Sequence, residues 1–182
     1  MTTNELLKIG SNFLKQNNIK SYMIDSELIL SSVSGQTRES FLVKSELILS
    51  KKQIKSFNDL IYRRALSKEP LAYLLSKKEF WSIELGINKD ALIPRPETEI
   101  LVDKLVKYYN DRSPFILDIG TGSGCIIISL LHEFKKSRGI AIDISNKALK
   151  IAKKNSKLND TFERIKFVNS SISNFNSFKF DL

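Results

Sequence analysis

Apolar positions in residues 1–75 recur every three or four residues, as in helices with one buried face. Thr2 and Glu5 have the spacing of a capping box, and so do Ser50 and Gln53. The apolar stripes that follow these boxes consist of Leu6, Ile9, Phe13 and Leu14, and of Ile54, Phe57, Ile61 and Ala65. A further helix is predicted over residues 24–33, ending before Gly35. The region therefore predicts a small helical bundle.

The middle of the chain has a different pattern. Residues 79–87 alternate between polar and apolar, which predicts a strand or a hairpin. Pro94 and Pro96 then stiffen a connector. An amphipathic helix is predicted from Glu97 onward, with a buried face made of Ile100, Leu101, Leu105 and Val106.

From residue 115 onward, short apolar runs alternate with helical patterns. The predicted strands cover residues 115–119, 139–143 and 165–168, with 178–182 opening a fourth, and the helices cover 125–134 and 146–158. Such alternation predicts an α/β domain with a parallel sheet and crossover connections. The predicted organisation is a helical domain (1–75), a hairpin and linker (76–99) and an α/β domain (100–182).

The loop after the first of these parallel strands carries three glycines, in the run Asp118-Ile119-Gly120-Thr121-Gly122-Ser123-Gly124. Glycines allow positive φ and close approach of a ligand, and the N-terminus of the next helix offers free N–H groups to an anion. The third glycine comes one place earlier than in the dinucleotide fingerprint, where Cys125 stands here. Asp118 would repel phosphate but can accept hydrogen bonds from an ammonium group. A ligand with amino and carboxylate groups, such as S-adenosylmethionine, fits best.

Asp143 ends the next predicted strand, where an acidic side chain meets ribose hydroxyls in nucleotide-binding sheets. The predicted cofactor residues are therefore Asp118, Gly120, Thr121, Gly122, Ser123, Gly124 and Asp143. Cys125 is interpreted as a small buried residue, and His132, the single histidine, as a surface residue. One cysteine and one histidine provide no metal cluster, so no metal is expected.

Composition narrows the picture further. The 182 residues carry a formal net charge of +9, spread over both halves of the chain, which favours a solvated surface over a nucleic-acid-binding face. We find neither a long apolar run nor a signal-peptide pattern. The expectation is a cytoplasmic monomer without membrane contact and without direct nucleic-acid binding.

Several motifs resemble known families. Residues 116–124, together with 141–145 and the helix after them, resemble motif I and the acidic motif of Rossmann-like methyltransferases. Residues 69–74, Glu79-Phe80-Trp81 and Leu92-Ile93-Pro94-Arg95-Pro96-Glu97-Thr98-Glu99 resemble the linker of the HemK/PrmC family, the release factor glutamine methyltransferases. The resemblance covers the whole chain and implies a helical bundle followed by a partial Rossmann-like class I methyltransferase domain.

The resemblance also implies a reaction. The methyl group of S-adenosylmethionine would pass to the side-chain amide nitrogen of the glutamine in the Gly-Gly-Gln motif of peptide chain release factors, which are the implied partners. In the family, an Asn-Pro-Pro-Tyr motif aims that nitrogen at the methyl group, so catalysis is mainly positioning. Ser171 and Ile172 fall where the family borders the adenine, although an acidic residue is common at the position of Ser171.

The sequence departs from the family at the catalytic motif. None of the four prolines follows an asparagine, and no two are adjacent, so Asn-Pro-Pro-Tyr is absent and no catalytic residue is assigned. We interpret the chain as ending before that motif. Alternatives are a non-catalytic remnant or partner-binding module, and an Asn-Pro-Pro-Tyr-type enzyme acting on nucleic acid. An NAD-dependent oxidoreductase is disfavoured by the position of Gly124.

Overall fold

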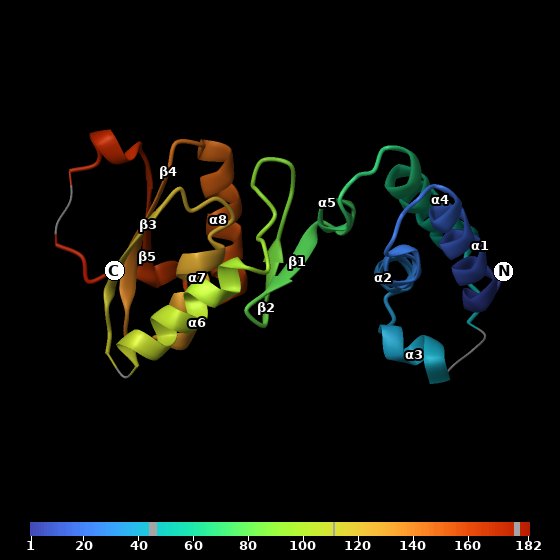
Figure 1. Cartoon of the computed structure of the whole chain (residues 1–182), viewed down its shortest axis with the longest axis horizontal. Helices are drawn as coiled ribbons and strands as arrows, with labels where there is room; N and C mark the ends of the chain where they lie inside the picture. Colours follow the sequence, from blue (N-terminus) through green and yellow to red (C-terminus); the bar gives the residue numbers. More distant parts are fainter. Residues whose placement is uncertain (44–46, 111, 177–178) are drawn as a thin grey trace. The chain divides into compact units, whose positions relative to one another are not determined.

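The computed structural model describes residues 1–43, 47–110, 112–176 and 179–182. The chain divides into two compact units, Met1–Leu75 and Ser76–Leu182 (Figure 1). Among the described residues, none of the helices combines the length and apolar character that crossing a bilayer would require.

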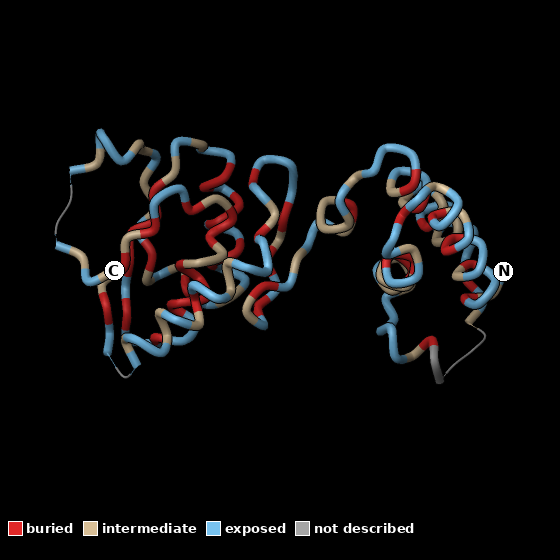
Figure 2. Tube along the Cα trace, viewed as in Figure 1, coloured by how far each residue is buried: buried red, intermediate tan, exposed pale blue. Residues whose placement is uncertain are grey.

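The first unit is helical. Its helices are α1 (Thr3–Gln16), α2 (Tyr22–Ser34), α3 (Arg38–Val43), α4 (Lys51–Leu66) and α5 (Leu71–Leu75). Both predicted capping boxes form, at the N-termini of α1 and α4, and Gly35 ends α2 in the left-handed conformation with φ 73°. Phe57 of α4 is fully buried in a core that also contains apolar residues of α1 and α2. Buried segments recur along these three helices in Figure 2. The predicted helical bundle is confirmed.

An ion pair lies within this helical core. Arg64 of α4 donates from Nε to Oδ2 of Asp25 in α2, over 2.6 Å. The side chain of Asp25 is only 6% exposed and that of Arg64 is 18% exposed. Arg64 also donates to the carbonyl of Glu69. The pair therefore joins α2 to the end of α4 from inside the unit.

The second unit begins with a hairpin of β1 (Lys77–Phe80) and β2 (Ile83–Gly86). Phe80 pairs with Ile83, so the turn consists of Trp81 and Ser82 alone. Both turn residues have positive φ, 51° and 58°, as two-residue turns that match the twist of a hairpin require. Asparagine and glycine are the usual residues in such a turn, so this turn is strained at two non-glycine positions.

The rest of the second unit is an α/β domain. Its elements are α6 (Thr98–Tyr109), β3 (Phe115–Ile119), α7 (Cys125–Glu133), β4 (Arg138–Asp143), α8 (Asn146–Leu158), the 3-10 turn η1 (Phe162–Arg164), β5 (Ile165–Asn169) and the 3-10 turn η2 (Ile172–Asn174). The strands are parallel, as the alternation of strands and helices predicts, and their order in the sheet is β3-β4-β5. α7 packs on β3 and β4, α8 packs on β4 and β5, and α6 packs on α7.

The predicted fourth strand is partly described, since Phe178 lies outside the described residues. Residues 179–182 are not assigned as a strand, yet they run beside β3. The N–H of Leu117 donates to the carbonyl of Leu182 over 2.7 Å, and the N–H groups of Asp181 and Leu182 donate to the carbonyl of Phe115. The Phe180 ring stacks on that of Phe115. These bonds follow the parallel pattern, so this segment extends the sheet past β3.

The predicted buried face of α6 is wrong in part. Ile100 and Leu101 are exposed, whereas Val102 is fully buried and Leu105 and Val106 are half-buried. Apolar residues stand on several sides of this helix, so the periodic pattern did not fix which side faces α7. Packing against α7 selects the side that contains Val102.

Candidate functional site

Three parallel strands end at one edge of the sheet, and the predicted site residues follow them. Ile119 of β3 pairs with Ile142 of β4, and Asp143 pairs with Asn169 of β5. The loops after all three strands therefore leave from the same edge, which is where open α/β sheets bind ligands. Asp118 and the glycine loop, Asp143, and Ser171 with Ile172 all belong to this edge.

The three glycines of the loop have two different functions. Gly120, Gly122 and Gly124 all have positive φ, at 71°, 57° and 82°. A Cβ atom added at Gly120 would meet nothing within 4 Å, and one added at Gly122 would meet only a carbonyl oxygen at 3.9 Å, so these two glycines border open space. A Cβ atom at Gly124 would lie 2.7 Å from Cδ1 of Ile128 and 3.2 Å from Cβ of Ala152. Gly124 therefore allows α7 and α8 to pack closely, while the first two leave room for a ligand.

Asp118 lies beneath this loop. It is buried, and its Oδ2 accepts a hydrogen bond from the Thr121 hydroxyl over 2.7 Å. Burial raises the pKa of Asp118, and the hydrogen bond from Thr121 opposes that rise only in part. A cationic group bound at Asp118 would favour the ionised carboxylate, so the affinity for such a ligand should fall as pH falls through the raised pKa.

Asp143 connects the glycine loop to the start of α8. Its Oδ2 accepts from the N–H of Gly122 over 2.9 Å, and its Oδ1 accepts from the N–H of Ser145 over 2.8 Å. A carboxylate has about four lone-pair sites, so both oxygens can accept further hydrogen bonds from a ligand's hydroxyl groups. Asp143 can thus hold the loop and a ligand at once.

The loop after β5 is fastened to the loop after β4. The side-chain amide of Asn169 donates to the carbonyls of Asp143 and Ile144, over 2.8 and 2.9 Å. Ser171 precedes η2, and its hydroxyl lies 2.9 Å from that of Ser173. These bonds keep the candidate adenine residues beside Asp143.

Two further candidate residues were missed at the level of sequence. Ile119, Ile144 and Ile172 are 54%, 79% and 56% exposed, and each stands at or just after the end of one of the three strands. Exposed isoleucines at this edge of the sheet provide an apolar surface against which a planar ring such as adenine can pack. Of the three, only Ile172 was predicted. The detectable signal was an apolar residue directly after Asp118 and directly after Asp143.

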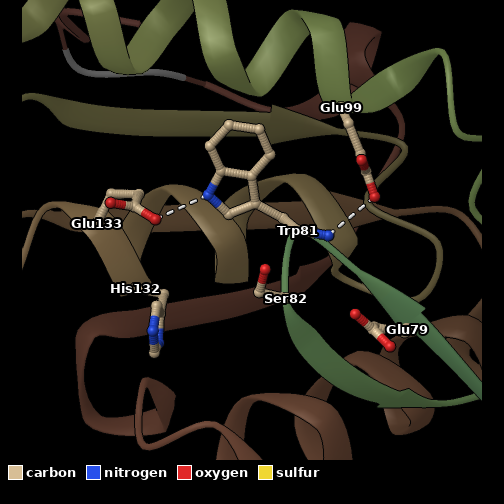
Figure 3. Close-up of a pocket in the computed structure, with 6 residues that line it drawn as sticks. All are labelled: Glu79, Trp81, Ser82, Glu99, His132 and Glu133. Atoms are coloured by element: carbon tan, nitrogen blue, oxygen red, sulfur yellow. Dashed lines mark hydrogen bonds between the residues drawn. The ribbon is translucent and has the colours of Figure 1, made fainter.

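A cavity of about 440 Å³ lies elsewhere in this unit, beside the hairpin turn (Figure 3). Its lining consists of Glu79, Trp81, Ser82, Glu99, His132 and Glu133. The indole N–H of Trp81 donates to Oε1 of Glu133 over 2.8 Å, and its backbone N–H donates to Oε1 of Glu99 over 3.0 Å. None of the predicted cofactor residues lines this cavity. His132 is exposed at the end of α7, whereas the glycine loop precedes the start of that helix.

Cys125 begins α7, directly after the glycine loop. Burial raises the pKa of its thiol to about 11. The thiolate is the reactive form, so we expect alkylation by iodoacetamide at pH 8 to be about 10- to 100-fold slower than for an exposed cysteine. The measurement is the alkylation rate by mass spectrometry, with the urea-unfolded chain as the control. Equal alkylation rates for the folded and the unfolded chain would contradict the burial and the raised pKa of the Cys125 thiol.

Comparison with known proteins agrees with this architecture. Residues 5–75 match the PrmC N-terminal domain, and residues 116–182 match a methyltransferase domain. The chain is 45% identical over 131 residues to the release factor glutamine methyltransferase of Buchnera aphidicola subsp. Schizaphis graminum, covering 72% of this chain and 47% of that protein. The chain thus combines a PrmC N-terminal domain with a methyltransferase domain. The resemblance to the PrmC family and the predicted class of fold are both confirmed.

Two more relatives show what share of a related protein this chain covers. The release factor glutamine methyltransferase of Buchnera aphidicola subsp. Acyrthosiphon pisum is 42% identical over 160 residues, covering 87% of this chain and 57% of the relative. A bifunctional methyltransferase of Rickettsia typhi is 35% identical, covering 98% of this chain and 38% of the relative. The chain thus spans about half the length of the release factor methyltransferases that it matches.

Proposed function

We propose that this chain forms the cofactor-binding part of an S-adenosylmethionine-dependent methyltransferase. The observation that carries the proposal is the open space over Gly120 and Gly122, between a buried Asp118 and a loop-holding Asp143. One side of this space offers acceptors for an ammonium group, and the other lies at the N-terminus of α7, where the first N–H groups have no partner within the helix. An amino acid joined to a nucleoside has both of the groups that this arrangement suits.

Each part of the ligand has a proposed counterpart. Asp118 accepts from the ammonium group, and the N–H of Ser123, with the N-terminus of α7 directly behind it, donates to the carboxylate. Asp143 accepts from the ribose hydroxyls. Ile144 and Ile172 pack against the adenine, and Ser171 offers it a hydroxyl group. When bound, the cofactor supplies a methyl group on a positively charged sulfur.

For the substrate, we propose the side-chain amide of the glutamine in the Gly-Gly-Gln motif of peptide chain release factors. The names of the Buchnera relatives and the match to the PrmC N-terminal domain support this choice. The 182 residues contain no Asn-Pro-Pro-Tyr, so we propose that residues outside this chain aim the amide nitrogen. Aiming matters because the amide lone pair is delocalised, and positioning then supplies much of the catalysis.

The same proposal assigns roles to the two units. Residues 1–75 would recognise the release factor, and residues 100–182 would hold the cofactor, joined by the hairpin and linker of 76–99. We further propose that the protein works in the cytoplasm as a monomer and without direct nucleic-acid contact. In the described part of the chain, no cluster of three metal-ligating side chains occurs.

The test has two arms. Calorimetry on the 182-residue chain should show one site for S-adenosylhomocysteine and none for NADH, and the reverse preference would overturn the cofactor assignment. A chimaera that joins these residues to the remaining part of a Buchnera relative should transfer labelled methyl to a release factor. It should not label a release factor whose motif glutamine is replaced by alanine. Equal labelling of both release factors would overturn the substrate assignment.

A further inference from the structure

One buried side chain, Asn155 of α8, connects the hairpin to the glycine loop. Its Nδ2 donates to the carbonyl of Ser123 over 2.9 Å and to the carbonyl of Gly86 over 3.0 Å. Its Oδ1 accepts from the N–H of Gly86 over 2.7 Å. Asn155 is 1% exposed. The amide therefore uses both of its donor hydrogens and its oxygen on backbone groups of two other segments.

The two segments differ in what they do. Ser123 lies in the loop proposed to hold the cofactor, while Gly86 is the last residue of β2 in the hairpin. Gly86 has an ordinary φ, yet a Cβ atom there would lie 3.2 Å from Oδ1 of Asn155. The glycine thus leaves the room that the amide needs. An apolar residue at position 155 would leave buried backbone groups of both segments without their partner, which is costly.

The far end of the hairpin is fastened as well. Trp81 in the strained turn is bonded to Glu99 of α6 and Glu133 of α7, as Figure 3 shows. The hairpin is therefore held to this unit at its turn by Trp81 and at the end of β2 by Asn155. Trp81 is also the single tryptophan of the chain, so its fluorescence reports on the hairpin alone.

We propose that Asn155 is a positioning residue that couples the hairpin to the cofactor loop. By holding the Ser123 carbonyl, it sets the path of Gly122 to Gly124, the part of the loop that is proposed to border the cofactor. By holding Gly86, it transmits a movement of that loop to the hairpin. The inference rests on the proposed cofactor function, and it adds that cofactor binding and hairpin position are linked in both directions.

Asn159 provides a matched control one helical turn later. Its Nδ2 donates to the carbonyl of Glu84 in β2 over 3.0 Å and to the carbonyl of Asn155 within α8. It therefore contacts the hairpin but not the glycine loop. Loss of Asn159 removes a bond to the hairpin of the same kind and leaves the connection from Asn155 to Ser123 in place.

The experiment measures affinity for S-adenosylhomocysteine by calorimetry and the Trp81 emission change in the same titration, on the full 182-residue chain. We expect N155A to raise Kd about tenfold and to abolish the emission change, because a buried carbonyl loses its donor. N159A should stay within about twofold of the original chain and keep the emission change. Unchanged affinity and emission in N155A would overturn the proposal. Absence of binding by the unsubstituted chain would overturn the cofactor function itself.

A second perturbation comes from the hairpin side. G86A should displace the Asn155 amide through its new Cβ atom and so raise Kd, although residue 86 lies outside the proposed cofactor residues. In an N155A background, G86A should have no further effect, because the amide is already gone. Fully additive effects of the two substitutions would overturn the coupling. If N155A proves poorly folded by circular dichroism, G86A alone decides the case, because it keeps the asparagine and only displaces its amide. An unchanged Kd in G86A would then overturn the proposal.

Discussion

Replacing Asp143 by alanine is expected to raise the Kd for S-adenosylhomocysteine about 100-fold or more. Two effects combine. The ribose loses charge-assisted hydrogen bonds, each worth about 1.5–3 kcal/mol. The N–H groups of Gly122 and Ser145 also lose the carboxylate that holds them, so the loop itself is less well ordered. Calorimetry at pH 7.5, with circular dichroism to verify folding, measures the effect.

Two further variants make the Asp143 experiment specific. D143N retains one acceptor oxygen, so its Kd should lie between those of the original chain and D143A. D103A is the matched surface control, because Asp103 forms an exposed pair with Lys107 within α6 and such pairs contribute little. D103A should bind as the unsubstituted chain does. A Kd for D143A within threefold of the original would contradict the role given to this carboxylate.

The parts of the fold that the sequence predicted are those set by local pattern. Capping at Thr2 and at Ser50 depends on residues three apart, and both boxes form. The parallel strands follow from short apolar runs separated by helical spacing, and their parallel direction agrees with prediction. The glycine loop and Asp143 were found in the same way, because each directly follows a strand. Their assignment to a cofactor remains a prediction.

The parts that the sequence could not predict depend on contacts between distant segments. Gly124 was grouped with the other two glycines, yet the atoms that exclude a side chain there belong to Ile128 and Ala152. The sequence placed Asn155 in a helix, but it could not predict its hydrogen-bond partners, which lie 32 and 69 positions away. Two exposed residues of α6, Ile100 and Leu101, were assigned to its buried face, because only the packing of α7 decides which side of this helix is covered.

These two classes of contact suggest how the second unit is built. The local sequence pattern determines where the strands, the helices and the glycine loop form. Buried polar side chains then fix the distances between them, with Asp143 joining the loop to α8 and Asn155 joining the loop to the hairpin. A ligand that settles in the loop therefore meets a backbone held from two sides, which reduces the ordering cost of binding.

The helical unit depends on one buried ion pair, and replacing Arg64 by alanine is expected to lower its free energy of unfolding by about 3 kcal/mol or more. The variant would leave the carboxylate of Asp25, only 6% exposed, without its cation. Removing one partner of a buried pair costs more than the pair contributes, since the remaining charge stays away from water. Urea denaturation of the 182-residue chain, followed by far-ultraviolet circular dichroism, measures the change.

The neighbouring arginine is the control for this experiment. Arg63 pairs with Glu69, whose side chain is 11% exposed, but Arg63 itself is 50% exposed and water reaches the pair from its side, so R63A should cost less than R64A, about 1–2 kcal/mol. The double variant D25A/R64A should recover part of the stability that R64A loses, because no unpaired charge remains. Equal effects of R63A and R64A would contradict a special role for the buried pair.

R64A should also bind S-adenosylhomocysteine normally, because cofactor binding is assigned to the second unit. The chimaera that carries R64A should methylate release factor poorly, because substrate recognition is assigned to the helical unit.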